Sequence, residues 1–180
     1  MSLPTHIQKR WPALSTICYA LFIILFSIWA REVYNWLIAA LGASFLKAAV
    51  WSAFALAISA AAWTGRGLGL KTSGLILLLA AAGIAYAATF EIFEERIHLV
   101  KYGLLGLLLC RDFDHRPAWR SFVLTLVCAL LVAGLDETGQ YFTPGRVADL
   151  RDVAFDVLGA GWGALTCLVL RKRGGHPSPR

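Results

Sequence analysis

Long apolar runs, separated by short charged segments, are the feature that most constrains this chain. Of its 180 residues, 58% are hydrophobic, against roughly 45–50% in soluble domains. An apolar run of ~20 residues can cross a bilayer as a helix, which satisfies its own backbone hydrogen bonds there. The sequence therefore predicts an all-α fold: a polytopic transmembrane helical bundle of about six spans, forming a single domain over residues 1–180.

The predicted spans follow the apolar runs in order. They are Ala13–Ala30, Phe45–Trp63, Gly74–Phe90, Ile97–Cys110, Ser121–Leu135 and Asp152–Leu170. An interfacial helix carrying Tyr34 and Trp36 is expected between the first two. The fourth run is short for a hydrocarbon core of ~30 Å, so it spans only if His98 and Lys101 lie near the interface. The basic tail, residues 171–180, is rich in Gly and Pro and is expected to be disordered.

Basic residues orient these spans. Most of the 17 Lys and Arg residues fall on the side of the two termini, including the cluster Arg171-Lys172-Arg173. The positive-inside rule then places both termini in the cytoplasm. We expect a multi-pass protein of the cytoplasmic (inner) membrane, with the lipid bilayer as its partner. We interpret the net charge of +6 as serving to orient the spans. No basic cluster larger than Arg171-Lys172-Arg173 indicates a nucleic-acid partner.

A polar stripe runs through residues 136–163, DETGQYFTPGRVADLRDVAFDVLGAGWG. Pro144-Gly145 predicts a turn, and before it three side chains share one face if the segment is helical. After the turn, Asp and Gly residues recur at the spacing of one helix face. The members of the stripe are Asp136, Glu137, Gln140, Asp149, Asp152, Asp156, Gly159 and Gly163.

Three members of this stripe, Asp156, Gly159 and Gly163, have a particular meaning within a membrane. A carboxylate in a lipid-bounded helix costs about 2.5–3.5 kcal/mol on insertion scales, so Asp156 is a site candidate that should face protein or water. If no cation lies beside it, we expect a hydrogen-bonding residue that Asn can replace. The GxxxG pair Gly159 and Gly163 lets another membrane helix approach closely.

This segment resembles the VanZ-like family of small bacterial membrane proteins, whose motif is roughly DExxQxFxPGRxxDxxDxxxNxxG. The matching residues are Asp136, Glu137, Gln140, Phe142, Pro144, Gly145, Arg146, Asp149, Asp152 and Gly159. Asp156 departs from the pattern, which has Asn there. An upstream family feature, an acid before H-x-x-x-Y-x-x-L, is similar to Glu94/Glu95, His98, Tyr102 and Leu105. The resemblance covers roughly Glu94 to Gly163 and implies low-level resistance to glycopeptide antibiotics of the teicoplanin type.

The fourth helix is expected to meet the polar stripe in one extracytoplasmic pocket. Its polar side chains recur on one face, and neither polar face can lie cheaply against lipid. The pocket could hold a cation through carboxylates and imidazole, or a phosphate or sugar headgroup through Arg146 and amide groups. Cofactor, metal and enzymatic activity stay open. The predicted members are Glu94, Glu95, His98, Tyr102, Asp136, Glu137, Gln140, Arg146, Asp149, Asp152 and Asp156.

Three functions are compatible with this pattern. The first is a cell-envelope protein that binds or modifies a lipid-linked or peptidoglycan-related ligand. The second is a proton-coupled membrane transporter in which His98 and Asp156 titrate. The third is a non-catalytic membrane assembly partner that docks through Gly159 and Gly163. A closed floor beneath the pocket favours the first, whereas a water-accessible path through the bundle favours the second.

Overall fold

The computed structural model describes residues 12–49, 51–52, 55, 69–88, 93–144 and 149–171. This part of the chain is helical and contains no strand, which confirms the predicted all-α class. The helices are α1 (Leu14–Leu41), α3 (Leu70–Ala88), α4 (Phe93–Asp112), α5 (Ala118–Tyr141) and α6 (Leu150–Arg171).

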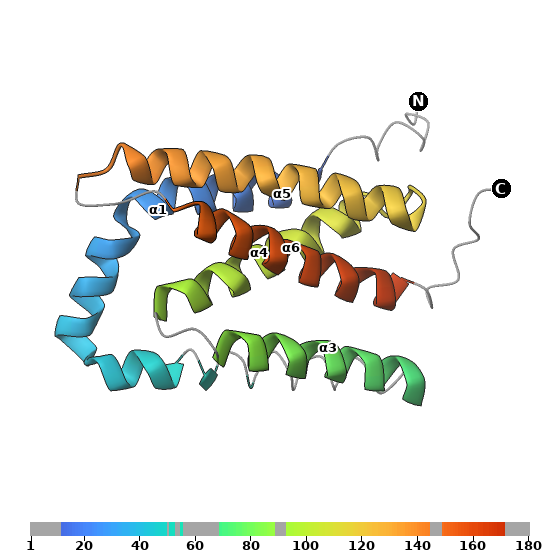
Figure 1. Cartoon of the computed structure of the whole chain (residues 1–180), viewed down its shortest axis with the longest axis horizontal. Coiled ribbons are helices and arrows are strands. Elements are labelled where there is room, and N and C mark those ends of the chain that lie inside the picture. The colour runs from blue at the N-terminus through green and yellow to red at the C-terminus, as the bar shows by residue number, and fades with distance from the viewer. Residues whose placement is uncertain are drawn as a thin grey trace, which may run out of the picture.

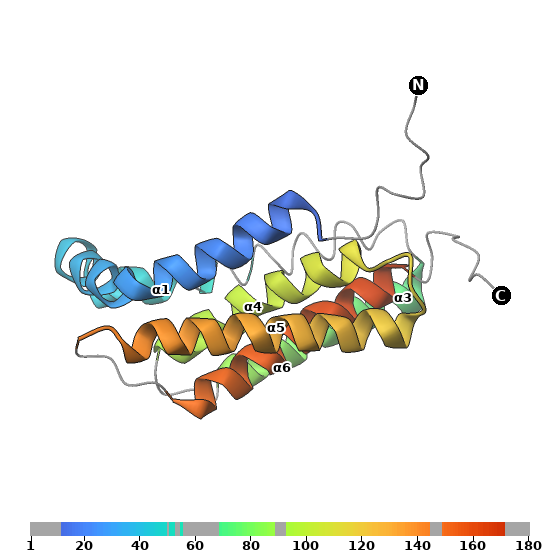
Figure 2. The same ribbon diagram turned by 90° about the horizontal axis from the view of Figure 1, so that it is seen from above.

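The helices pack as a bundle around α6. This helix packs against α4, α5 and α3, and it lies between α5 and α3 in Figure 1. On the other side, α1 lies across α5 and α4 (Figure 2). The core is apolar and draws on four helices and the turn after α4. Its buried members are Ile23, Tyr102, Leu105, Leu109, Phe113, Ala129, Ala133 and Ala160.

Small residues bring α4 and α6 into backbone contact. A Cβ added to Gly163 would collide with the carbonyl oxygen of Gly103, and one added to Gly159 would lie 2.8 Å from the carbonyl oxygen of Leu99. Small residues permit such close approach between membrane helices. The helix that packs on the GxxxG face is therefore α4 of the same chain. The expectation that this face docks another membrane protein is wrong, because it is already covered.

The helix that carries the first predicted span, Ala13–Ala30, is longer than that span. α1 continues past Ala30 to Leu41, and Arg31 and Glu32 stand exposed on its surface. Charged residues do not end a helix when they can face outward, and the helix instead ends at Gly42. This glycine has a φ of +83°, a region that residues with a side chain rarely adopt. The second half of α1 turns away from α5 (Figure 1), as expected for a segment with an interfacial part.

Three of the described helices, α1, α5 and α6, are long and apolar enough to cross a membrane, and α3 contributes a shorter apolar stretch, Leu70–Tyr86. α4 has 20 residues, about 30 Å of helix, which is longer than the apolar run Ile97–Cys110 suggested. Charged and polar residues in the first half of α4 make it less apolar than α1, α5 and α6, so it is not among the helices that can cross a membrane by this measure. The second predicted span, Phe45–Trp63, lies largely outside the described residues, so the number of six spans stays a prediction.

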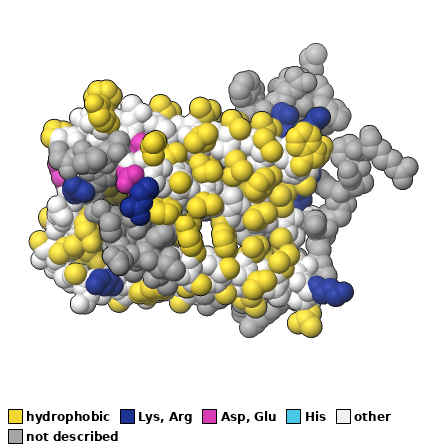
Figure 3. Space-filling view, in the orientation of Figure 1, with side chains coloured by type: hydrophobic (Ala, Val, Ile, Leu, Met, Phe, Trp, Pro, Cys, Tyr) yellow, Lys and Arg dark blue, Asp and Glu magenta, His cyan; other side chains and the backbone are white. Residues whose placement is uncertain are grey.

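The surface agrees with a membrane location. On the face shown in Figure 3, hydrophobic side chains cover the middle of the bundle and charged side chains lie toward its ends. Large apolar side chains such as Leu131 and Trp29 are 64% and 60% exposed. An apolar band of this kind is stable against lipid and unfavourable against water.

The bundle has two distinct ends. At one end, the Ala13 N–H donates to Asp112, and Arg171 donates to the main-chain oxygen of Arg116. The chain therefore enters α1 and leaves α6 at this end, which we call the terminal end. At the opposite end α5 finishes and α6 begins (Figure 1), and we call this the motif end. Its assignment to the extracytoplasmic side stays a prediction.

Candidate functional site

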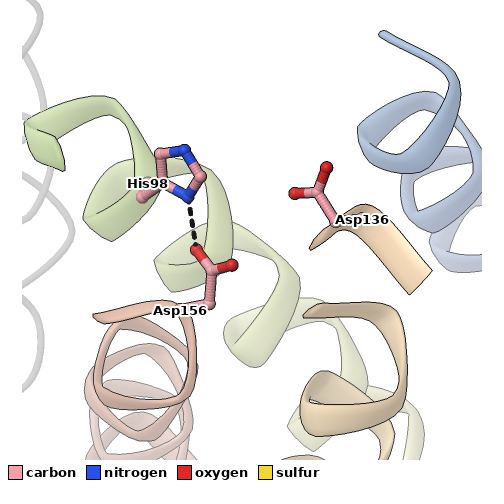
Figure 4. Close-up of side chains that lie close together, drawn as sticks. All are labelled: His98, Asp136 and Asp156. Carbon is pink, nitrogen blue, oxygen red and sulfur yellow. Dashed lines mark hydrogen bonds and ion pairs between the residues drawn. The ribbon is translucent and has the colours of Figure 1, made fainter. Parts of the chain in front are cut away.

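Three helices bring ionisable side chains together near the motif end: His98 from α4, Asp136 from α5 and Asp156 from α6 (Figure 4). His98 Nδ1 lies 2.9 Å from Asp156 Oδ1. Both aspartates are fully buried and His98 is 9% exposed. Buried charges are stable only when they are paired and hydrogen-bonded. The three side chains therefore form a site whose members depend on one another.

Asp136 is the most heavily hydrogen-bonded member. Its Oδ2 accepts from Lys101 Nζ at 2.8 Å and from the Tyr102 hydroxyl at 3.1 Å. Its Oδ1 accepts from Gln140 Nε2 at 3.4 Å. Lys101 lies three positions after His98, on the polar face of α4 that helical spacing predicts to meet the stripe. Its contact with Asp136 brings it into the site.

The polar contacts continue from Asp136 to the end of the bundle. Gln140 Nε2 also donates to Glu137 Oε1 at 3.0 Å. Glu137 Oε2 in turn accepts from the main-chain N–H of Asp149 at 3.0 Å, and Asp149 is exposed. A continuous hydrogen-bonded path thus joins the exposed start of α6 to the buried aspartates.

Two of the predicted acids lie at this start of α6 rather than at its buried centre. Asp149 Oδ1 accepts from the Arg151 N–H at 2.8 Å, which is the hydrogen bond of a helix N-cap. Asp152 is half-buried in the first turn. The member of the stripe that pairs with His98 is Asp156, one helical turn after Asp152.

Asp156 has one oxygen that is not satisfied. Its Oδ2 is buried and has no hydrogen-bond partner among the described residues. The single proton of the neighbouring Tyr102 hydroxyl goes to Asp136. That Asn can replace Asp156 stays a prediction.

Apolar residues close the bundle beneath the cluster. Toward the terminal end, α4 continues with the buried side chains of Leu105 and Leu109, and Phe113 follows in the turn. α5 and α6 contribute the fully buried Ala133 and Ala160. These apolar side chains form a floor under the polar site in the described part of the bundle.

Three predicted members are not placed by the structure. The side chains of Glu94 and Glu95 lie outside the described part of α4, and Arg146 lies in the undescribed segment between α5 and α6. The remaining predicted residues with described side chains, apart from Asp149 and Asp152, converge in the network around Asp136 and Asp156. These are His98, Tyr102, Asp136, Glu137, Gln140 and Asp156.

A family model described as VanZ/LLP1 matches residues 11–171. The chain belongs to the VanZ-like family. The match covers every described helix, so the relationship extends well beyond the segment from Glu94 to Gly163 in which the sequence motifs lie. Comparison with curated proteins and with solved structures gave no match. This VanZ-like chain is thus a membrane protein by family and by the character of its helices.

The cluster of this VanZ-like protein has a defined chemical capacity. Imidazole and carboxylate groups can exchange protons with a bound molecule, and together they can ligate a cation. Lys101 adds a positive charge that can contact a phosphate.

Proposed function

We propose that this protein binds the headgroup of a lipid-linked, peptidoglycan-related ligand at the motif end, in the cytoplasmic membrane of a bacterial cell envelope. His98, Lys101, Asp136 and Asp156 contact the headgroup, and His98 with a carboxylate provides the acid and base if the ligand is also modified. Reduced sensitivity to teicoplanin-type antibiotics, which the family resemblance implies, would follow from a changed supply of such a ligand.

The observation that carries the proposal is a buried polar network whose hydrogen bonds reach an exposed residue at the motif end. Hydrogen bonds lead from the exposed Asp149 through Glu137 and Gln140 to Asp136. Ionisable residues inside membrane helices are costly and are usually functional. A network used only to hold the helices together would not need to reach the end of the bundle.

The apolar floor beneath the site favours ligand binding over proton-coupled transport. A proton or substrate path would have to continue past Leu105 and Leu109 of α4 and the alanines of α5 and α6, all of which are buried and apolar. Polar groups are needed along such a path, because an unsatisfied charge in apolar surroundings is strongly disfavoured. The site is accordingly best described as a pocket entered from the motif end.

A direct test measures lipid binding by the purified full chain in nanodiscs. The probe is a polyprenyl-pyrophosphate-linked peptidoglycan precursor, with phosphatidylglycerol as the comparison lipid. His98→Gln should weaken binding of the precursor at least about tenfold, equivalent to 1.4 kcal/mol. Equal affinity for the precursor and phosphatidylglycerol, unchanged by His98→Gln, would refute the proposal.

The matched control for this experiment lies at the terminal end. His115 is exposed in the turn after α4, so His115→Gln makes the same chemical change about as far from the site as the bundle allows. It should leave binding of the precursor unchanged. Equal losses in the two variants would indicate a general loss of folded protein, which a thermal unfolding curve detects independently.

A further inference from the structure

We propose that His98, Asp136 and Asp156 bind one divalent transition-metal cation. Its use in the cell rests on the proposed function, because the metal would help to bind or activate the headgroup of the lipid-linked ligand. Its binding, in contrast, depends only on the three side chains and can be measured without any lipid.

The geometry of the three side chains fits a small cation. One ligand atom from each of His98, Asp136 and Asp156 can be chosen so that all lie within 4.8 Å of one another. In a tetrahedral zinc site with bonds of about 2.0–2.1 Å, ligand atoms lie about 3.4 Å apart. Small side-chain rotations would therefore close the site. Figure 4 shows the carboxylates of Asp136 and Asp156 and the ring of His98 grouped around one space between α4, α5 and α6.

The unsatisfied oxygen of Asp156 is an independent reason to expect a cation there. Oδ2 is buried and has no hydrogen-bond partner among the described residues, while Oδ1 accepts from His98. A buried carboxylate oxygen without a hydrogen-bond partner is unfavourable by about 1–3 kcal/mol. A metal ion would satisfy this oxygen directly, whereas a purely structural ion pair leaves it unsatisfied.

The ligand set indicates which metals would bind. One imidazole and two carboxylates suit Zn²⁺, Fe²⁺ and Mn²⁺. Imidazole is a good ligand for zinc and iron, and carboxylate is a good ligand for harder cations such as Mn²⁺. Mg²⁺ prefers six oxygen ligands in an octahedral shell and retains its waters. Three protein ligands also leave a position open for a ligand oxygen or water, as in catalytic zinc sites.

The residues around Asp136 would orient it as a ligand and regulate its availability. Tyr102 and Gln140 donate hydrogen bonds to its carboxylate, the kind of support that ligating carboxylates usually have. Lys101 Nζ lies 2.8 Å from Asp136 Oδ2, where it provides positive charge in place of a metal. Lys101 and a metal ion should therefore compete for Asp136.

Isothermal titration of the purified, metal-stripped full chain with Zn²⁺ and Mn²⁺ tests the proposal. We expect one equivalent to bind, and Mg²⁺ to bind more weakly. His98→Ala and Asp136→Asn each remove a ligand and should weaken Zn²⁺ binding by more than the about 10–100-fold that loss of an orienting partner costs. Asp156→Asn retains a weaker oxygen ligand and should cost about tenfold, equivalent to about 1.4 kcal/mol.

Lys101→Met provides the decisive contrast. A competing cation predicts that its removal raises the affinity for Zn²⁺, whereas a structural ion pair predicts lower stability and no gain in affinity. The proposal is overturned if no metal binds, if His98→Ala and Asp156→Asn bind as well as the parent chain, or if Lys101→Met fails to raise the affinity. Thermal unfolding of each variant separates a lost ligand from a lost fold.

The outcomes also separate the metal from the proposed function. If metal binding is absent but His98→Gln still loses the lipid-linked precursor, the metal proposal fails and the ligand pocket stands. If Zn²⁺ binds as expected but the precursor binds no better than phosphatidylglycerol, the metal site stands and the proposed ligand fails.

Discussion

The two ends of the bundle hold polar groups in different ways. At the terminal end, Asp112 Oδ2 accepts from the Ala13 N–H at 2.7 Å and from Thr16 Oγ1 at 2.6 Å, and its Oδ1 accepts from Arg111. Arg171 donates to the main-chain oxygen of Arg116 at 2.7 Å. At the motif end, the bonds of Asp136 and Asp156 run between buried side chains of different helices.

The comparison separates structural from functional polarity. The polar groups of the terminal end satisfy main-chain atoms where helices begin and end, which any helical protein must do. At the motif end, the two buried aspartates satisfy no helix terminus, and one oxygen of Asp156 has no partner in the described part of the chain. Arg116 Nε at the terminal end is also buried without a partner among the described residues. In the part of the chain that the structure describes, however, only the motif end combines such an atom with a second buried carboxylate and an imidazole.

The largest expected effect comes from disrupting the close backbone contact between α4 and α6 at Gly163. Gly163→Leu would force a side chain against the backbone of α4 at Gly103, so its cost should exceed the about 1–3 kcal/mol that overpacking of a core typically costs. Because the obstruction is backbone, we expect little folded protein. Gly134→Ala is the control: a Cβ there meets nothing within 4 Å, and helix propensity predicts a gain of up to about 1 kcal/mol. Equal yields of the two variants in detergent would show that α4 and α6 do not touch as described.

The next effect concerns the ion pair at the motif end. Asp136→Leu leaves Lys101, Tyr102 and Gln140 without their acceptor, and breaking a buried pair costs about 3–5 kcal/mol. The Lys101 side chain is 16% exposed, which places the expected loss toward about 3 kcal/mol. Adding Lys101→Met should recover much of this stability without restoring ligand binding. If the double variant recovers both its stability, measured by denaturation, and its ligand binding, measured by titration, the Lys101–Asp136 pair is structural.

A smaller effect is expected at the terminal end. Asp112→Asn keeps an oxygen for Ala13 and Thr16 but weakens both hydrogen bonds, which should lower the free energy of unfolding by about 1 kcal/mol. Binding of the lipid-linked precursor and of Zn²⁺ should not change. A tenfold loss of either in a titration would mean that the two ends are not independent.

The orientation of the ends can be tested without altering stability. In a chain lacking its native cysteines, Thr143→Cys at the motif end should react with a membrane-impermeant thiol reagent added outside intact cells. His115→Cys at the terminal end should react only after the membrane is opened. The reverse labelling pattern would place the motif end in the cytoplasm and exclude an extracytoplasmic ligand.

Much of the helical fold could be predicted from apolar runs, because length and hydrophobicity alone determine which segments can span a bilayer. The helix ends were less predictable. Arg31 and Glu32 do not interrupt α1, since both stay on its surface, and α4 extends beyond its apolar run at both ends. Such boundaries depend on which neighbours a side chain meets, and the sequence does not show these.

The candidate site was predictable in its membership and less so in its pairings. Helical spacing grouped Asp136, Glu137 and Gln140 on one face, and all three are buried there. Spacing alone could not indicate that His98 pairs with Asp156, because that pairing depends on the glycine contact that sets how α4 lies along α6. Spacing likewise could not indicate that Lys101 pairs with Asp136, because Asp136 lies on a third helix.

The central claim is that buried charge at the motif end serves a ligand, and Asp136→Asn compared with Asp112→Asn tests it most directly. Both changes remove one carboxylate charge and keep its shape. For Asp136→Asn, the affinity for the lipid-linked precursor in nanodiscs should fall at least about tenfold, or 1.4 kcal/mol. For Asp112→Asn it should stay at the parent value. Thermal unfolding curves should show that both variants are folded. Parental affinity in folded Asp136→Asn protein would contradict the account and leave the cluster a structural contact between α4, α5 and α6.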